Sequence, residues 1–192
     1  MVRILNNTEE DALIGSIGTF YSLSDCSRIC GNGIIINFSE KFGKVTYSDL
    51  RFTTFDKKEF QLYYRKEKLL IDVTLELLRE FQEIYVFNYG DKWITDKKIA
   101  PSLNKILKDN KVFDGDSRVL QLTEESEVVA FVKSILRYNT FVSFFDSEKG
   151  IVITPTDHLD IFIDSKDDYV NTVREIIENE RTIFCFTQKN ID

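Results

Sequence analysis

The single histidine is the residue best suited to acid–base or metal chemistry. His158 and Asp160 are two residues apart in a segment that alternates polar and apolar side chains, as a half-buried strand does. On such a strand both side chains lie on one face, about 7 Å apart, where they could bind one ion or let the carboxylate orient the imidazole. Asp164 shares that face but lies about 13 Å away, too far to join the same ion. A solvated polar face on a half-exposed sheet explains the same pattern, and we favour that interpretation.

Other residue sets that could carry chemistry are incomplete. Cys26 and Cys30 would supply half of a zinc site, whereas a structural zinc needs four ligands. Asp56 and Glu59, with the basic residues at 65–66, match the carboxylate cluster of a metal-dependent nuclease only loosely. The sequence contains no phosphate-binding or dinucleotide-binding glycine pattern and no G-x-S-x-G nucleophile motif. We therefore predict no catalytic residue, no metal ion and no cofactor.

The composition is that of an ordered globular chain. Of the 192 residues, 43% are hydrophobic and 13% aromatic, so the chain can bury a core. We predict one compact domain spanning 1–192, with the segment 88–100 as the place where two subdomains would meet. No stretch approaches the roughly 18 apolar residues of a membrane span, and the acidic run Glu9–Asp11 stands where a secretory signal would be basic and then apolar. We expect a soluble, cytoplasmic protein with reduced thiols and no membrane partner.

In the first half of the chain, the apolar patterns predict a helix and then a β-meander. Thr8 is expected to cap a helix that stops at Gly15, and residues 21–31 are expected to form a loop. Alternating polar and apolar residues between 33 and 65 predict the meander, and Thr74 is expected to cap a further helix. The strands predicted in this half span 33–38, 44–53, 59–65, 69–71 and 84–87.

The second half combines hairpins with three predicted helices. These helices are expected to begin at Pro101, at Thr123 and after the capping box Ser165–Asp168. The segment 182–187 is apolar on both faces, so we predict a central strand with Cys185 buried in it. The strands predicted in this half span 118–122, 141–145, 151–153, 158–164 and 182–187. Together the two halves predict an α+β fold, with mostly antiparallel sheet and four to five packed helices.

The net charge of −7 is concentrated in the second half of the chain. Residues 1–100 carry 14 Lys and Arg against 15 Asp and Glu, whereas residues 101–192 carry 11 against 17. A negative field repels nucleic-acid phosphates and attracts basic surfaces, so we expect a basic protein partner and no direct nucleic-acid binding. Two acidic tracts are expected to carry the contact: Asp114, Asp116, Glu124, Glu125 and Glu127, and then Asp157, Asp160, Asp164, Asp167 and Asp168.

Aromatic residues are more numerous than a core of this size requires. The chain has Phe at 16 positions, Tyr at 8 and Trp at 1. Aromatic rings are frequent at interface hot spots because they bury a large area at a low entropic cost. We therefore include Tyr89 and Trp93, which lie in the boundary segment, among the predicted partner-binding residues.

Together these features favour a binding protein over an enzyme. The incomplete catalytic sets, the acidic second half and the aromatic surplus predict an inhibitor or immunity-type protein, of a bacterium or its phage, that occludes a basic partner. Two alternatives stay open. One is an enzyme of unfamiliar type centred on His158 and Asp160, and the other is a homo-oligomeric structural component that pairs through an exposed sheet edge.

Overall fold

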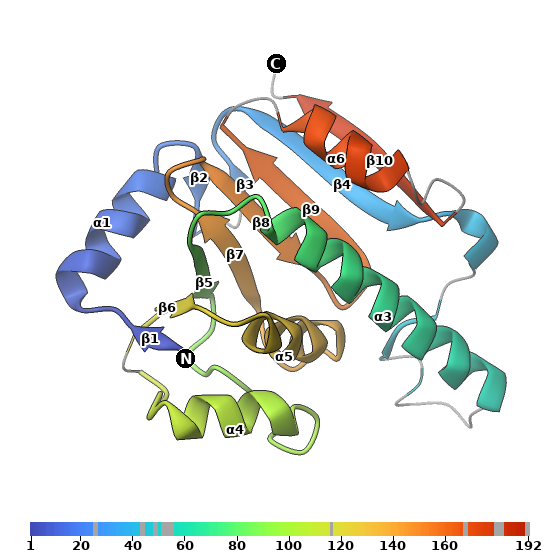
Figure 1. Ribbon diagram of the computed structural model, residues 1–192, viewed down its shortest axis with the longest axis horizontal. Coiled ribbons are helices and arrows are strands. Elements are labelled where there is room, and N and C mark those ends of the chain that lie inside the picture. Colours follow the sequence, from blue (N-terminus) through green and yellow to red (C-terminus); the bar gives the residue numbers. More distant parts are fainter. Residues whose placement is uncertain are drawn as a thin grey trace.

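One antiparallel sheet runs through the whole molecule (Figure 1). The computed structural model describes residues 1–24, 27–42, 45–47, 50, 56–115, 117–166, 169–178 and 183–190. The sheet has eight strands in the order β1-β6-β5-β7-β8-β9-β4-β10, and each neighbouring pair is antiparallel. Five α-helices of the described residues pack around it, so the predicted α+β fold is confirmed.

Strands from both sides of the segment 88–100 belong to this one sheet, because β5 pairs with both β6 and β7. The strands of the sheet are β1 (Arg3–Ile4), β4 (Asn32–Phe38), β5 (Ile84–Asn88), β6 (Val119–Leu122), β7 (Val142–Asp146), β8 (Ile151–Pro155), β9 (Asp160–Ser165) and β10 (Phe184–Asn190). A small two-stranded sheet consists of β2 (Tyr21–Ser22) and β3 (Ser27–Arg28). The helices are α1 (Asn7–Ile17), α3 (Lys57–Leu78), α4 (Pro101–Asp109), α5 (Glu125–Leu136), α6 (Val170–Glu178) and a 3-10 helix, η1 (Glu40–Phe42).

The two faces of the large sheet are covered differently. Helices α3, α4, α5 and α6 lie on one side, which faces the viewer in Figure 1, and they pack on inward side chains such as Phe144 and Ile153. On the opposite side, α1 and the β2–β3 hairpin cover β6, β5, β7 and β8, where Phe145 and Val152 form a smaller core. No described helix covers the same side of β9, β4 and β10, where Phe162 is 38% exposed. The described helices therefore leave part of one sheet face uncovered.

The strands predicted at 59–65 and 69–71 are wrong, since Lys57–Leu78 forms the single helix α3. Asp56 caps this helix by accepting a hydrogen bond from a backbone N–H of the first turn at 3.0 Å. Thr74, the expected cap of a later helix, lies inside α3, where its hydroxyl donates to a carbonyl one turn earlier at 2.7 Å. The predicted meander therefore ends after its first strand.

A helical period explains why α3 forms in this segment. The fully buried side chains Tyr63, Leu70 and Leu77 recur every seven residues, which is two helical turns. The alternation over 60–64 covers too few residues to separate a period of 2 from a period of 3.6. In the helix, Tyr64 points outward and is 50% exposed. The many Lys, Glu, Leu and Arg residues of the segment also favour a helix over a strand.

Helix α1 begins two residues earlier than the sequence predicts. Its cap is Asn6 rather than Thr8. The Asn6 side chain accepts a hydrogen bond from the Glu9 N–H, and the Glu9 carboxylate accepts one from the Asn6 N–H, both at 3.0 Å. The helix continues through Gly15 to Ile17, since one glycine costs a helix only about 1 kcal/mol.

Three further predictions fall partly outside the described residues. The strand predicted at 44–53 is described only in part, and none of its described residues is in a strand. The segment 21–31 contains the β2–β3 hairpin in place of the expected loop, and Cys26 within it lies outside the described residues. The Ser165–Asp168 capping box is also described only in part, with Ser165 at the end of β9.

Strand β10 lies at an edge of the sheet, so the prediction of a central strand is wrong. It pairs with β4 alone among the described strands. Phe184 and Phe186 pack on the helical side, whereas Cys185 and Thr187 point to the open side and are exposed. The Cys185 thiol donates to the Asn37 carbonyl at 3.7 Å, and the expectation that it is buried is also wrong.

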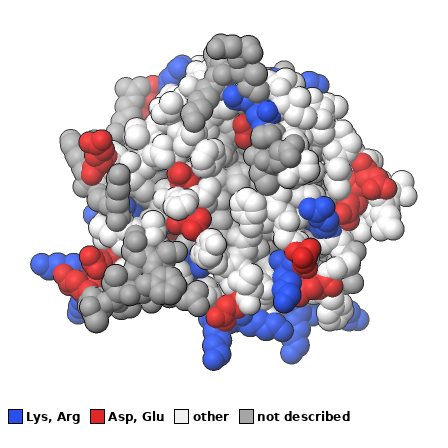
Figure 2. All heavy atoms as spheres, turned by 180° about the vertical axis from the view of Figure 1, so that it is seen from behind, with Lys and Arg blue, Asp and Glu red and all other residues white. Residues whose placement is uncertain are grey.

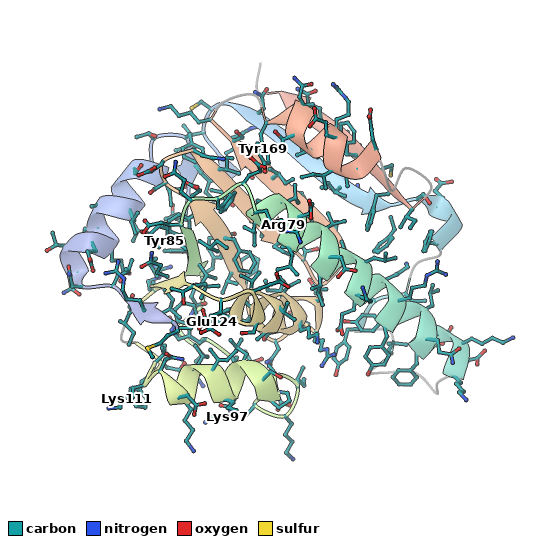
Figure 3. The ribbon with its side chains drawn as sticks, viewed as in Figure 1. Arg79, Tyr85, Lys97, Lys111, Glu124 and Tyr169 are labelled. Atoms are coloured by element: carbon teal, nitrogen blue, oxygen red, sulfur yellow. The ribbon has the colours of Figure 1, made fainter. Side chains whose placement is uncertain are left out.

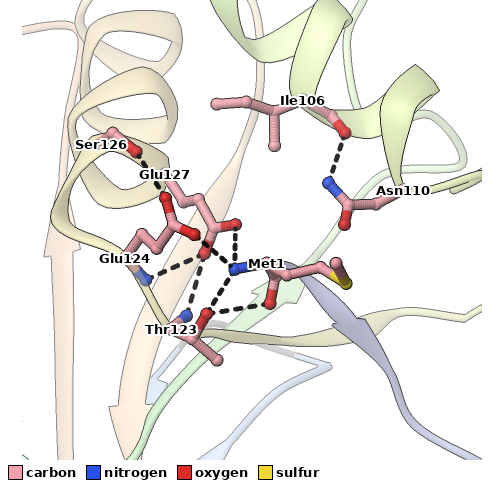
Figure 4. Close-up of polar contacts among 7 residues, drawn as sticks. All are labelled: Met1, Ile106, Asn110, Thr123, Glu124, Ser126 and Glu127. Carbon is pink, nitrogen blue, oxygen red and sulfur yellow. Dashed lines mark hydrogen bonds and ion pairs between the residues drawn. The ribbon is translucent and has the colours of Figure 1, made fainter.

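Carboxylates of Glu124 and Glu127 cap the first turn of α5 (Figure 4). Glu127 accepts hydrogen bonds from the N–H groups of Thr123 and Glu124 at 2.9 and 3.1 Å, and Glu124 is the cap where Thr123 was the predicted one. The Met1 ammonium group lies 3.0 Å from Glu124 and 3.1 Å from Glu127. Both carboxylates therefore hold the N-terminal strand to α5.

Polar contacts join the helices of this layer to one another at two points. Tyr169, labelled in Figure 3, precedes α6 and donates its hydroxyl to the Leu77 carbonyl at 3.1 Å, which fixes α6 to the end of α3. In the middle of α3, Glu67 accepts hydrogen bonds from Arg137 Nε and Nη2 on its two carboxylate oxygens, at 2.7 and 2.8 Å. The Tyr63 hydroxyl donates to the same carboxylate at 3.1 Å.

None of the described helices is both long and apolar enough to cross a membrane.

The Glu67–Arg137 pair is largely withdrawn from solvent, since the two side chains are 5% and 22% exposed. The hydrogen bonds from Arg137 to Glu67 raise the pKa of the guanidinium, and burial raises the pKa of the Tyr63 hydroxyl. Both groups therefore keep their protons across the whole physiological range. The pair joins α3 to the end of α5.

Removing Glu67 is expected to destabilise the protein strongly. A Glu67→Ala variant leaves the partly buried Arg137 without its carboxylate, so we expect the free energy of unfolding to fall by about 3–5 kcal/mol, measured by urea denaturation. Asp72→Ala breaks the exposed Lys68–Asp72 pair on the same helix and is the control, with an expected loss below about 1 kcal/mol. Equal losses in the two variants would contradict the role assigned to the buried pair.

Candidate functional site

Two adjoining hollows open at one end of the strands, where β5 and β8 end and β7 begins. The larger has a volume of about 590 Å³ and is lined by Asn88, Tyr138 and Asp157, among others. The smaller has a volume of about 200 Å³, and both hollows are lined by Phe141 and Thr156. We call the two hollows together the aromatic groove.

Exposed aromatic rings surround the aromatic groove. Tyr138, Phe141 and Phe162 are 68%, 52% and 38% exposed, and they come from the α5–β7 turn, the start of β7 and the middle of β9. Figure 2 shows the molecule from the side opposite to Figure 1, and uncharged atoms fill much of the centre of this view, with a few acidic groups among them. Exposed rings that gather around a hollow are typical of binding surfaces.

A chain of hydroxyl groups lies behind the smaller hollow. The Thr154 and Ser143 hydroxyl oxygens are 2.5 Å apart, and the Ser143 oxygen is 2.9 Å from the Tyr89 hydroxyl. The Tyr89 hydroxyl in turn donates to the Tyr21 hydroxyl at 3.5 Å. Because a connected polar network of this kind has few alternative arrangements, it holds the floor of the hollow in one geometry.

Carboxylates line the side of the aromatic groove that β8 and β9 form. Asp164 faces the smaller hollow, and burial raises its pKa to about 6, although the nearby Arg28 acts in the opposite direction. Asp160 accepts a hydrogen bond from the Thr156 hydroxyl, and burial raises its pKa as well. Asp157 lines the larger hollow. These carboxylates make the groove suitable for a positively charged group.

One wall of the larger hollow is fixed by a buried amide. Asn139 is 1% exposed, and its carbonyl oxygen accepts hydrogen bonds from the Thr95 hydroxyl at 2.7 Å and the Asp96 N–H at 2.6 Å. The next residue, Thr140, donates its hydroxyl to the Trp93 carbonyl at 2.7 Å. The loop after β5 is therefore tied to the start of β7, and the hollow exists before anything binds.

The first predicted acidic tract is mostly engaged within the fold. Glu124 and Glu127 cap α5 and pair with the N-terminal ammonium group. Asp114 accepts a backbone hydrogen bond from the loop after β5 at 3.1 Å. Glu125 is exposed, and Asp116 lies outside the described residues. Since hydrogen bonds and ion pairs within the fold occupy three of its members, this tract offers less free charge than its composition suggests.

The second predicted acidic tract contributes three carboxylates to the aromatic groove or its rim. Asp157 and Asp164 line the hollows directly, and Asp160 accepts a hydrogen bond from the hydroxyl of Thr156, which lines both hollows. The last two members, at 167 and 168 (Asp167 and Asp168), lie outside the described residues.

The two predicted contact rings, Tyr89 and Trp93, have different environments. Tyr89 lines the smaller hollow, and its ring centroid lies 4.8 Å from that of Phe141. Trp93 is 2% exposed and packs edge-on against Phe131 at 5.9 Å. The Trp93 ring therefore belongs to the core and is not available on the surface.

Sequence reasoning missed the three exposed rings of the groove. Phe162 lies between Ile161 and Ile163, which both point to the core, so strand alternation places it on the outward side. An aromatic residue on the outward phase of an amphipathic strand was thus the signal that could have found it. Tyr138 and Phe141 had no such signal, because they lie in a turn and at a strand start.

The pair His158 and Asp160 is not arranged as the sequence predicts. β9 begins at Asp160, and Leu159 before it has a φ of 64°, so strand alternation does not extend to His158. The exposed His158 lies in a turn and lines a separate hollow of about 330 Å³ together with Lys66. Within the described part of the chain, no group of three or more His, Cys, Asp or Glu could hold a metal ion.

The raised pKa of Asp164 predicts a specific pH dependence of stability. The pKa of Asp164 is about 6 in the folded protein and 3.8 for the usual carboxyl group, so the folded state holds this proton more tightly than the unfolded state. The resulting stabilisation of the folded state is complete below pH 3.8 and is lost as the pH rises through 6. An Asp164→Asn variant should therefore gain stability relative to the native protein between about pH 4 and pH 7, by at most about 3 kcal/mol. Urea denaturation of both proteins across this range measures the difference, and a difference that is the same at every pH would contradict the assignment.

Comparisons with known protein families, with curated proteins and with solved structures found no match for this chain. The functional conclusion therefore rests on the chemistry of the aromatic groove.

Proposed function

We propose that the protein binds a partner protein in the aromatic groove and acts by covering part of that partner's surface. The observation that carries this proposal is the position of three exposed rings, Tyr138, Phe141 and Phe162, around two adjoining hollows, with Phe162 on the part of the sheet face that no described helix covers. Rings that enter or border a pocket account for much of the binding energy at protein interfaces.

The charge of the protein favours a basic partner. The chain has a net charge of −7, and Asp157, Asp160 and Asp164 lie in or beside the aromatic groove. Complementary charge of this kind mainly speeds the encounter and selects among partners, whereas the buried rings supply affinity. Of the partner-binding residues predicted from the sequence, Tyr89 and these carboxylates belong to the proposed contact.

The rigidity of the groove supports a binding role. The Asn139 hydrogen bonds hold one wall, and the Ser143–Thr154 hydroxyl pair holds the floor of the smaller hollow. A surface that is already ordered loses little conformational entropy when a partner binds, so more of the contact energy appears as affinity.

Selection from a random peptide library displayed on phage tests this proposal without knowledge of the natural partner. We expect the native protein to enrich peptides that bind in the aromatic groove, and a Phe141→Ala/Phe162→Ala variant to bind them at least about tenfold more weakly, since losing two contact rings removes more than about 1.4 kcal/mol. Fluorescence anisotropy with labelled peptides measures the affinities.

Tyr64→Ala is the matched control, because Tyr64 is also an exposed ring, 50% exposed, but lies on α3 at the helical face. This variant should bind the selected peptides with native affinity. Peptides that bind the double variant as tightly as the native protein would contradict the proposal, and so would a selection that enriches no peptide over an unrelated control protein.

A further inference from the structure

The smaller hollow has the dimensions of a site for one side chain. Its volume of about 200 Å³ lies below the roughly 300 Å³ at which small-molecule pockets usually begin. Rings from Tyr21, Tyr89, Phe141 and Phe162 form most of its walls, and it joins the larger hollow at Phe141. A segment lying along the larger hollow could therefore place a single side chain in the smaller one.

Asp164 gives this small site a defined chemical preference. It lies two residues after Phe162 on β9, so both side chains point to the open face of the sheet. Among the described residues its carboxylate receives no hydrogen bond, but a charged group lies near it, because Asp164 Oδ1 and the Arg28 guanidinium both lie against Gly33. Arg28 on β3 is the charged group that influences it, and the effect of burial is the larger of the two. A partly buried carboxylate binds a cation favourably, because the cation replaces the solvent that burial removes.

Two hydroxyl groups line the same hollow as Asp164 and can accept hydrogen bonds from a ligand. Thr154 and Thr156 on β8 line the same hollow, and Thr154 lies opposite Phe162 in the β8–β9 register. Each hydroxyl oxygen has two acceptor positions, and the Thr156 oxygen uses one of them for the His158 N–H at 3.2 Å. A donor-rich ligand therefore finds a remaining acceptor position on β8 as well as the carboxylate on β9.

The rings restrict which cation fits best. Phe141 and Phe162 border the hollow, and a planar guanidinium stacks on aromatic faces while it donates in its own plane to a carboxylate and to hydroxyl oxygens. A lysine ammonium group is compact and strongly hydrated, so it satisfies the carboxylate but gains less from the rings and the hydroxyls. An acidic side chain is repelled by Asp164.

From these contacts we infer that the smaller hollow is the site for an arginine side chain of the partner protein, with its guanidinium on Asp164 and its plane against Phe141 or Phe162. This inference rests on the proposed protein-binding function and adds the identity of the anchoring residue. It also explains why Asp164 is kept among rings, where an unused carboxylate would be unfavourable.

Capped single amino acids test the inference directly. N-acetyl-arginine methylamide, its uncharged citrulline analogue and its lysine analogue are titrated into isotope-labelled protein, and backbone amide shifts are followed by NMR. We expect the arginine compound to shift the amides of Thr154, Thr156 and Phe162, the citrulline compound to bind at least tenfold more weakly, and the lysine compound to fall between them. Equal binding of the arginine and citrulline compounds would overturn the inference.

Two aspartate variants locate the charge that matters. The preference is the ratio of the affinities for the arginine and citrulline compounds. Asp164→Asn should lower this ratio at least tenfold. Asp157→Asn, which changes a carboxylate of the larger hollow, should change the ratio less than threefold. The NMR spectrum of each variant reports whether it is folded. Retention of the arginine preference in a folded Asp164→Asn variant, or an equal loss in both variants, would overturn the assignment to Asp164.

The outcomes of this test and of the peptide selection are distinguishable. If selected peptides depend on Phe141 and Phe162 but bind equally well when their arginines are replaced by citrulline, the binding function stands and the arginine site fails. If neither the Phe141→Ala/Phe162→Ala variant nor the replacement of arginine by citrulline weakens the binding of any selected peptide, both the binding function and the arginine site fail.

Discussion

The ion pair between Glu67 and Arg137 links three parts of the helical layer. It joins the middle of α3 to the end of α5, and Arg137 also donates to the Ile99 carbonyl at 3.5 Å, just before α4. The chain continues from Arg137 directly into residues 138–141, which form a wall of the aromatic groove. Because the pair is withdrawn from solvent and its hydrogen bonds are bidentate, it permits few alternative positions of that wall.

The groove also shows how charge is divided between structure and binding. Glu127 has an acidic side chain like those at the groove, but its hydrogen bonds to the start of α5 and its contact with the N-terminal ammonium group occupy it. Asp164 has no such bonds from the described residues, and it lies among rings at an open face. Two carboxylates that look equivalent in the sequence thus differ because, among the described residues, backbone N–H groups donate to Glu127 and none donates to Asp164.

Local patterns predicted the second half of the chain well and much of the first half poorly. The hairpin of β7 and β8 and the helix α5 were predicted from turn residues and apolar spacing, and the structure confirms them. In α3 the short alternation around Tyr64 outweighed the helical spacing of Tyr63, Leu70 and Leu77. The helical signal extends over 22 residues, so a window of five residues could not reveal it.

The sequence by itself determined which side chains of each correctly predicted strand point together. The alternation of Ile161, Phe162 and Ile163 places Phe162 outward whatever the strand pairs with, since successive residues of a strand face opposite ways. Only the tertiary structure decided that β10 is an edge strand, that Trp93 is buried and that Phe141 and Asp164 line the same hollow. Those outcomes depend on the pairing of strands distant in the chain and on which face the helices cover, and local propensity does not specify either.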